Sequence, residues 1–327
     1  RSCLVGSEMC IRDSNNAKAS SPEWQILEKV ALASVNEQKK TRRWGILFKS
    51  LTFLYLFFVL MAIVPNANVG GLHKQEPHVG VVALDGLIAA DTEANANSVV
   101  TGLRAAFEAE QSVAVILAIN SPGGSPVQSG YINDEIVRLR KLHPEKKLYA
   151  VIADLGASGG YYVASAADEI YADKASLVGS IGVISAGFGA NGLLEKIGVD
   201  RRIYSAGESK SFLDMFSPEK ESDREFWQSV LNVTHQQFID VVKRGRGDRL
   251  LDDPKIFSGL IWTGQQAVEM GLVDGLGSVG KVARDVVGVD QLHEYTVQPH
   301  PFEGLAKRFG VTIKTHLLSG LQQTLSY

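Results

Sequence analysis

Cysteine is scarce in this chain of 327 residues: Cys3 and Cys10 stand in the first ten positions, and none follows. We therefore expect neither a disulfide framework nor a thiolate zinc site. An excess of one charge is also lacking, because the formal net charge is −3, and this balance gives no indication of nucleic-acid binding. The sequence contains no phosphate loop, no metal-ligand spacing and no dinucleotide fingerprint, so no cofactor is expected.

One long apolar run is present. Residues 45–64 read GILFKSLTFLYLFFVLMAIV, and about 20 such residues suffice for a helix that crosses about 30 Å of hydrocarbon. A basic cluster at 39–43 precedes the run, and no positive charge follows it until Lys74. The positive-inside rule then predicts an uncleaved transmembrane anchor with a cytosolic N-terminus. A buried core helix and a cleaved signal peptide are the alternatives.

The run divides the chain into segments of different character. We expect residues 1–21 to be disordered or, over the first 16, not native to the gene. The other expected segments are a cytosolic amphipathic helix at 22–44, the transmembrane helix at 45–64, a polar linker at 65–77, a compact domain at 78–289 and a C-terminal tail at 290–327.

Apolar runs of strand length alternate with helical periods inside the compact domain. Strands are expected at 79–89, 113–120, 148–157, 169–173 and 178–185, and helices at 96–110, 131–142, 158–167, 219–243 and 265–277. This alternation predicts an α/β fold with mostly parallel strands.

Two glycine-rich turns carry candidate catalytic groups. Ser158 directly follows an apolar strand and opens a helix, with Gly159 beside it. This position presents a hydroxyl at a strand-to-helix turn, where the helix dipole favours a developing oxyanion. Gly123 and Gly124 also follow a buried strand, and their N–H groups could point at a carbonyl oxygen. The alternatives are an N-cap serine and an ordinary turn.

A serine nucleophile needs a base. Only His143 and His235 lie in the central part of the domain, one before a proline in a loop and one among polar residues of a helix. A lysine can serve instead when desolvation favours its neutral amine, which alone accepts a proton. Lys210 is the best lysine candidate, because it lies in a loop of small residues with apolar residues just after it. A solvated surface lysine is the alternative reading.

Several stretches, in this order along the chain, together resemble the signal peptide peptidase A (SppA) family of membrane-bound serine proteases. They are INSPGG (119–124), ASGGYYVASAAD (157–168), LVGSIGVI (177–184), AGESKSFLD (206–214), HQQFIDVVKRGRG (235–247) and GQQAVEMGLVDGLG (264–277). The resemblance covers about residues 78–280. It implies a Clp-protease/crotonase-like catalytic domain of repeated ββα units, preceded by one transmembrane helix.

The resemblance also implies a role for each matching residue. It implies that Ser158 is the nucleophile and Lys210 the general base, and that Ser180 orients the lysine by a hydrogen bond. It also implies that Gly159 and Gly124 donate to the oxyanion, with Gly123 as the alternative to Gly124. The implied activity is a membrane-anchored serine endopeptidase with a Ser–Lys dyad. Its implied substrates are apolar peptides, above all cleaved signal peptides. Because the chain resembles the short members of the family, the resemblance also implies a homo-oligomeric ring. In such a ring the dyads can be completed between neighbouring protomers.

The expected location is the bacterial inner membrane, with a single pass through residues 45–64 and the catalytic domain on the extracytoplasmic side. Two other functions stay open at this point. One is a crotonase-like acyl-CoA enzyme on the same fold, and the other is a catalytically silent membrane scaffold.

Overall fold

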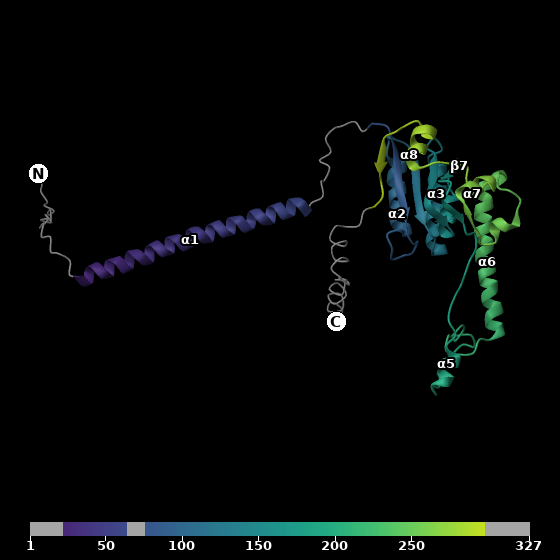
Figure 1. Cartoon of the computed structure of the whole chain (residues 1–327), viewed down its shortest axis with the longest axis horizontal. Helices are drawn as coiled ribbons and strands as arrows, with labels where there is room; N and C mark the ends of the chain where they lie inside the picture. The colour runs from purple at the N-terminus through teal and green to yellow at the C-terminus, as the bar shows by residue number, and fades with distance from the viewer. Residues whose placement is uncertain (1–21, 64–75, 298–327) are drawn as a thin grey trace, which may run out of the picture. The chain divides into compact units, whose positions relative to one another are not determined.

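The computed structural model describes residues 22–63 and 76–297 (Figure 1). The chain divides into two units, one of residues 1–73 and one of residues 74–327. The expected N-terminal segment 1–21, most of the linker and most of the tail lie outside the described residues.

The first unit contains one helix, α1 (Pro22–Ile63), which runs without a break through the expected amphipathic helix and into the expected transmembrane segment. Among the described residues, no helix proves long and apolar enough for a membrane crossing. The transmembrane span expected at 45–64 is therefore not confirmed. The charged first half of α1 ends in Arg42 and Arg43, and the expected span reaches Val64, which is not described.

The second unit contains an eight-stranded sheet in the order β6-β5-β3-β2-β1-β8, with β4 beside β3 and β7 beside β4. The strands are β1 (His78–Asp85), β2 (Ser112–Ser121), β3 (Leu148–Ala157), β4 (Glu169–Ala172), β5 (Leu177–Gly179), β6 (Ile261–Thr263), β7 (Gly275–Leu276) and β8 (Leu292–Glu294). Every pair is parallel except β5 with β6. This arrangement confirms the predicted α/β fold with mostly parallel strands.

Helices connect and cover these strands. They are α2 (Ala96–Glu108), α3 (Pro126–Leu142), α4 (Gly159–Ala164), α5 (Asn191–Lys196), α6 (Glu221–Arg246), α7 (Gly264–Glu269) and α8 (Val279–Lys281), with the 3₁₀ helices η1 (Gly247–Arg249) and η2 (Pro254–Phe257) and the π-helix η3 (Val282–Val287). Helix α3 begins at Pro126, earlier than the predicted residue 131. The Ser125 side chain caps it by accepting from the N–H of Gln128, and proline suits the first helical position.

The strand β3 holds the centre of the sheet. Its first half pairs with β4 and its second half with β5, while β2 runs along its other edge. The larger core lies between the sheet and helices α2, α3 and α4, and includes Leu103, Phe107, Ile132, Ile136 and Tyr161. A smaller core lies on the other sheet face under η3. Because β2 and β3 are covered on both faces, they read as continuous apolar runs in the sequence.

The domain extends beyond its predicted end at residue 289. Strand β8 lies in the segment assigned to the tail, yet it pairs with β1 from Val79 to Val81. Tyr295 follows it, and its hydroxyl lies 2.9 Å from Nε2 of the buried His78. These three residues of β8 gave too short a pattern to be recognised as a strand.

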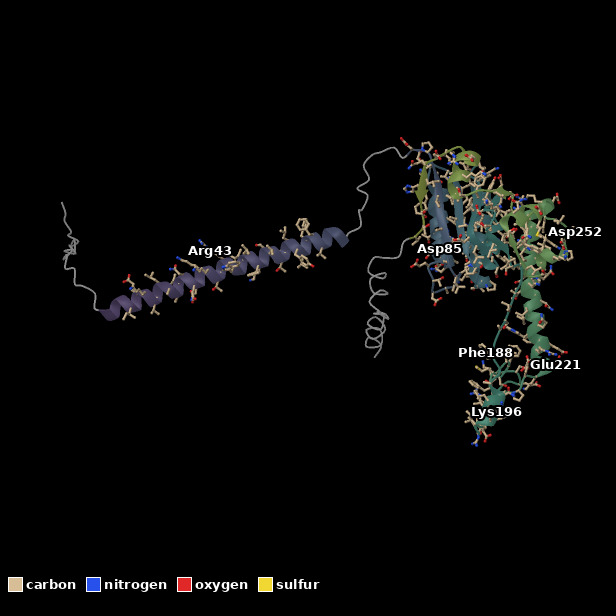
Figure 2. All side chains as sticks on the ribbon, in the orientation of Figure 1. Arg43, Asp85, Phe188, Lys196, Glu221 and Asp252 are labelled. Carbon is tan, nitrogen blue, oxygen red and sulfur yellow. The ribbon has the colours of Figure 1, made fainter. Side chains whose placement is uncertain are left out.

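Residues 183–220, which we call the arm, connect the sheet to α6 and include α5. Figure 2 shows Phe188 and Lys196 at the end of α6 that begins with Glu221, away from the sheet. Apolar side chains of the arm are exposed to an unusual degree, with 87% for Ile184, 87% for Phe188 and 93% for Tyr204. The strand predicted at 178–185 is shorter in the structure, because Ser180, whose φ is 52°, ends β5.

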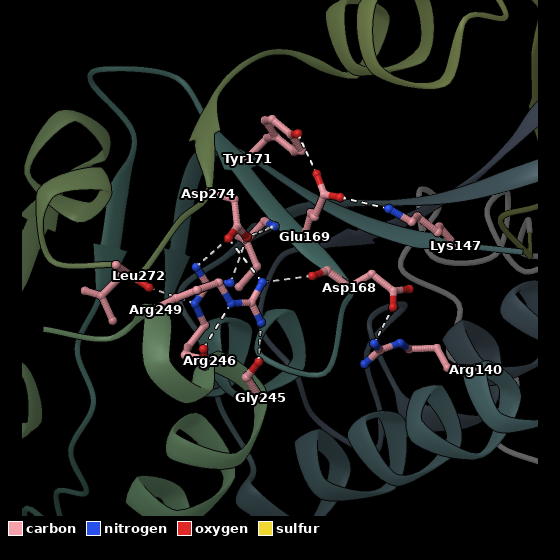
Figure 3. Close-up of polar contacts among 12 residues, drawn as sticks. Arg140, Lys147, Asp168, Glu169, Tyr171, Gly245, Arg246, Arg249, Leu272 and Asp274 are labelled. Carbon is pink, nitrogen blue, oxygen red and sulfur yellow. Dashed lines mark hydrogen bonds and ion pairs between the residues drawn. The ribbon is translucent and has the colours of Figure 1, made fainter. Parts of the chain in front are cut away.

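A buried ion pair fixes the opposite end of α6. The side chain of Arg246 is 1% exposed and donates to both carboxylate oxygens of Asp274, at 2.8 and 3.0 Å (Figure 3). Arg249 adds a contact at 3.1 Å, and the N–H of Ile170 donates to the same carboxylate at 2.7 Å. Burial alone would raise the pKa of Asp274, but the hydrogen bonds from Arg246 and Ile170 outweigh it and hold that pKa below 3.8.

Replacing Arg246 by methionine should lower the free energy of unfolding by about 3 kcal/mol, because the carboxylate of Asp274 would stay buried without its main partner. Urea denaturation of the full chain measures this loss. Since the folded-state pKa of Asp274 is depressed, the pair stabilises the fold above pH 3.8 and loses its effect as the pH falls through the folded-state value. The difference between the two proteins should therefore shrink in acid.

The matched control is Arg284→Met, which removes an exposed ion pair with Asp285. We expect a change below about 0.5 kcal/mol, as is usual for exposed pairs. Equal losses in both variants would contradict a structural role for the buried pair.

Candidate active site

Ser158 stands at the carboxyl end of β3, at the turn into α4. Its φ of 52° and ψ of −122° are rare for a residue with a side chain, and such backbone strain costs on the order of 1–3 kcal/mol. Two backbone hydrogen bonds hold it there. The Ser158 N–H donates to the Gly179 carbonyl at 2.8 Å, and the Ser158 carbonyl accepts from Tyr162 at 2.9 Å. Strained positions that the surrounding structure enforces are frequent at active sites.

The loop of Gly123 and Gly124 lies directly against this turn. A β-carbon at Gly123, whose φ is +93°, would stand 2.5 Å from the nitrogen of Gly159 and 2.8 Å from the β-carbon of Ser158. A β-carbon at Gly124 would collide with the carbonyl of Ile88, with which this glycine forms an isolated parallel bridge. The two turns therefore approach each other so closely that only glycine fits between them.

Gly124 and Gly159 bring two backbone N–H groups close to this point, and neither has a recorded backbone acceptor among the described residues. A β-carbon at Gly159 would lie 3.2 Å from the nitrogen of Gly124, so the two glycines are adjacent. Within residues 76–297, neither N–H is recorded as donating to another backbone group. Free, adjacent N–H donors beside a serine hydroxyl have the arrangement that stabilises an oxyanion.

A cavity of about 180 Å³ opens beside Ser158. Its walls come from four parts of the chain: Gly124, Pro126 and Ser129 around the start of α3, Ser158, Gly159 and Tyr162 in and before α4, residues 182–184, and Thr234, Gln237 and Phe238 of α6. The rings of Tyr162 and Phe238 lie 5.1 Å apart, and burial raises the pKa of Tyr162. The cavity is thus mostly apolar, with the candidate nucleophile at its edge.

Ser180 occupies a position equivalent to Ser158 on the neighbouring strand. Ala157 of β3 is in register with Gly179 of β5, so the two serines follow paired residues. Ser180 also has a φ of 52°, and its N–H donates to the Leu260 carbonyl at 2.8 Å. The structure therefore brings Ser158, Ser180 and the glycine loop together at the carboxyl ends of β2, β3 and β5.

Lys210 is not brought to this cluster within one chain. It is an exposed residue of the arm, and it is absent from the cavity wall. The turn around it is nevertheless well held. The Lys210 N–H donates to the Gly207 carbonyl at 3.1 Å, and the ring of Phe212 packs edge-on against Phe226 and Trp227 at 5.6 and 5.7 Å.

The two histidines considered as bases have other neighbours. His143 caps the end of α3, and its Nδ1 lies 3.6 Å from Glu145. His235 is half-buried on α6, and its Nε2 lies 3.2 Å from the carbonyl oxygen of Ile181. Neither is recorded in contact with the Ser158 hydroxyl. In the described ranges, no group of three His, Cys, Asp or Glu side chains could hold a metal ion.

Sequence reasoning missed part of the cavity wall. Thr234 and Gln237 look like solvated positions of a polar helix, although they share one face of α6 with the buried Phe238. Thr234 lies three residues before Gln237 and four before Phe238, which lies four before Val242, and this helical spacing is the signal that could have placed them there. Ser129 was read as part of a turn, because the start of α3 was predicted too late.

Comparison with known proteins places this site in a family. The family model "Peptidase family S49" matches residues 140–289, a range that contains Ser158, Ser180 and Lys210. The "Serine protease SPPA, chloroplastic" of Arabidopsis thaliana is 32% identical over 187 residues, which are 57% of this chain and 27% of that protein. The "Probable protease SohB" of Buchnera aphidicola is 33% identical over 232 residues, 68% of this chain and 66% of that protein.

Another relative carries a different name. The "Na(+)/H(+) antiporter NhaA" of Brucella abortus is 48% identical over 197 residues, which are 60% of this chain and 26% of that protein. The matched residues are thus a minor part of the antiporter, and the chain spans 26% to 66% of the length of these three relatives. The parallel sheet described above is compatible with a peptidase of this family. The chain therefore belongs to the SppA-type peptidases of family S49 and carries their serine peptidase domain.

Proposed function

We propose that the chain is a membrane-anchored endopeptidase that uses Ser158 as nucleophile and Lys210 as general base, on a Clp-protease/crotonase-like fold. The observation that carries the proposal is the strained turn of Ser158, enclosed by the glycine loop and open to an apolar cavity. An acyl-CoA enzyme could use the same free N–H groups, but it would have no use for an activated serine beside them.

Hydrolysis would proceed through an acyl-enzyme. Neutral Lys210 takes the proton of the Ser158 hydroxyl while Oγ attacks the carbonyl carbon of the scissile peptide bond. The N–H groups of Gly159 and Gly124 hold the oxyanion, and one such donor is worth about 3 kcal/mol. Gly123, the alternative donor, is disfavoured because its N–H already donates to the Ser121 hydroxyl at 3.1 Å. The protonated lysine then gives its proton to the leaving amine. Water hydrolyses the acyl-enzyme with the same lysine as base.

The base would come from a second copy of the chain. In this proposal the arm of one protomer brings Lys210 to Ser158 and Ser180 of its neighbour in a homo-oligomeric ring. The exposed apolar side chains of the arm support such an assembly, because surfaces of this kind are usually covered by a partner. Ser180 would hydrogen-bond the amine and orient it.

The substrates would be apolar peptides, above all cleaved signal peptides. A cavity of about 150 Å³ can hold a benzene molecule, so the cavity beside Ser158, at about 180 Å³, has room for one leucine-sized side chain. We assign this cavity to the substrate residue that precedes the scissile bond. Its apolar walls, formed in part by Tyr162 and Phe238, favour such a residue.

Anchoring would rest on residues 45–64 in the bacterial inner membrane, with the peptidase domain on the extracytoplasmic side. The described apolar side chains of α1, from Ile46 to Phe58, are exposed, and the apolar run continues in the sequence to Val64. A solvated helix with this composition is costly, whereas a lipid environment favours it.

Replacing either Ser158 or Lys210 by alanine should abolish peptide cleavage, with a loss of at least about 10⁴ in kcat, since the two groups act as a unit. Cleavage of an apolar signal-sequence peptide and labelling by a fluorophosphonate probe measure this on the detergent-solubilised oligomer. Near-full activity of Lys210→Ala would make another group the base. A wild type that neither labels nor cleaves would favour the silent scaffold.

A mixture of the two inactive variants distinguishes the source of the lysine. If the dyad forms between protomers, co-assembled Ser158→Ala and Lys210→Ala chains create some sites with both groups intact, and part of the activity returns. An inactive mixture would show that serine and lysine come from one chain.

Gly123→Ala should greatly slow probe labelling of Ser158, because its β-carbon would meet the nitrogen of Gly159 at 2.5 Å and its φ is +93°. Strain and overpacking together cost at least about 2 kcal/mol. Gly130→Ala is the control, since a β-carbon there has nothing within 4 Å. In the helix α3 this change should be neutral or stabilising by up to about 1 kcal/mol.

Two arginines in the apolar run should release the chain from membranes. We expect Leu54→Arg combined with Phe57→Arg to move the protein into the soluble fraction on alkaline carbonate extraction, because each charge costs about 3 kcal/mol in the bilayer. Leu32→Arg, which lies on α1 outside the run, should remain in the pellet. Retention of the double variant would contradict the anchor.

A further inference from the structure

His235 connects the two walls of the cavity beside Ser158. It lies on α6 between Thr234 and Gln237, both of which line the cavity. Its Nε2 lies 3.2 Å from the carbonyl oxygen of Ile181, the residue directly before the opposite wall of residues 182–184. The ring is half-buried, so water competes less for this hydrogen bond than at an exposed site.

The backbone of the opposite wall has few hydrogen bonds, although the side chain of Ile181 just before it is buried in the core. Ile181 follows Ser180, and the next residues, 182–184, line the cavity where the arm begins. Between Ser180 and Ala190, whose own N–H groups donate to Leu260 and Met215, no backbone hydrogen bond is recorded in the described part of the chain. The contact with His235 is therefore the one recorded hydrogen bond to the backbone of residues 181–189.

The wall on α6, by contrast, is firmly placed. Phe238 is buried three residues after His235, and Val242 follows it into the core on the same face. At the end of this face, Gly245 packs so closely on the carbonyl of Ser165 that a β-carbon would not fit, and Arg246 forms its buried ion pair. A hydrogen bond from His235 thus joins to a fixed helix a backbone segment that has no other recorded hydrogen bond among the described residues.

The chemistry of this contact also defines the protonation of the ring. A backbone carbonyl oxygen only accepts hydrogen bonds, so Nε2 of His235 must carry the proton. A nitrogen that already carries a proton cannot take one from Ser158. Nδ1 of the neutral ring is then the nitrogen that could accept a proton, and among the described residues it has no recorded contact with the Ser158 hydroxyl.

We propose that His235 is a positioning residue of the peptidase: it holds residues 181–184 against α6 and so sets the width of the cavity that receives the substrate side chain. The role rests on the proposed function, since it requires Ser158 to act on a peptide whose side chain enters this cavity. His235 acts through Ile181 and does not touch the reacting atoms.

The test compares His235→Phe, which keeps a ring but has no donor, with His235→Gln, whose amide reaches about as far as Nε2 and can donate. Two peptides are used, with leucine or alanine before the scissile bond, together with a fluorophosphonate probe. For His235→Phe we expect kcat/KM on the leucine peptide to fall about tenfold, mostly through KM, as for the loss of one hydrogen bond. The alanine peptide and the labelling rate should change by less than about twofold, because neither fills the cavity.

The glutamine variant should recover most of the lost kcat/KM. Gln236→Ala is the matched control, because this neighbour is exposed, contacts Asp240 and should leave both peptides unaffected. If the phenylalanine variant does not fold, His235→Asn, whose amide is too short to reach Ile181, takes its place with the same expected loss.

Two results would overturn the role of His235. One is wild-type kinetics of the variant on both peptides, and the other is an equal loss on both peptides and in labelling, which indicates general damage. A wild type without labelling or cleavage overturns the proposed function itself, and the role of His235 with it. If the wild type is labelled and cleaves both peptides normally, and His235→Phe behaves like the wild type, only this inference is overturned.

Discussion

The space around Ser158 is so small that only hydrogen atoms fit at Gly123, Gly124 and Gly159, and the whole site depends on this packing. The carboxyl ends of β2 and β3 lie next to each other because the strands are parallel, so the two turns that follow them must meet. Their contact leaves no room for side chains, and it leaves two N–H groups without backbone acceptors. Ser158 itself is held at its positive φ by its backbone hydrogen bonds to Gly179 and Tyr162. The free donors beside the Ser158 hydroxyl are thus a result of this close approach.

The second constraint is the placement of α6, whose two ends have different surroundings. Its last turn is attached to the sheet through Arg246 and Asp274, and the hydroxyl of Tyr161 in α4 donates to the Leu272 carbonyl two residues before that aspartate. One buried network therefore fixes both the helix that begins at Ser158 and the helix that lines the cavity. The first half of α6 extends away from the sheet and is joined to the arm. A long helix can transmit position over this length because its own hydrogen bonds make it stiff, whereas the extended chain of residues 182–189 cannot.

Much of this arrangement could be predicted from the sequence. The apolar runs of β2 to β4 predict those strands to within one residue, whereas β1 ends at Asp85, four residues before its predicted end. The resemblance implied that Ser158 and the glycine loop act together, and the parallel pairing of β2 and β3 explains why the turns after them are neighbours. Three features could not be predicted. Helix α3 starts earlier than predicted because Ser125 caps it, and the three residues of β8 are too few to form a recognisable strand pattern. The third feature is the arm, whose apolar side chains are exposed. Apolar residues such as Ile184 and Phe188 predict burial, yet in the part of the chain that the structure describes they are exposed.

The position of Lys210 could not be predicted from the local sequence either. A lysine that is to act as a base must be desolvated, yet in the single chain it is exposed and distant from any wall that could exclude water. Its turn is nonetheless ordered, because Phe212 packs on Phe226 and Trp227, and Asp214 accepts from Ser217 and Arg201, hydrogen bonds that lower the pKa of Asp214. An ordered loop loses little further entropy when it docks. In the proposed assembly the arm would therefore dock as a preformed segment. Burial of its apolar residues against a neighbouring domain would supply both the energy of docking and the dry environment that a neutral lysine requires.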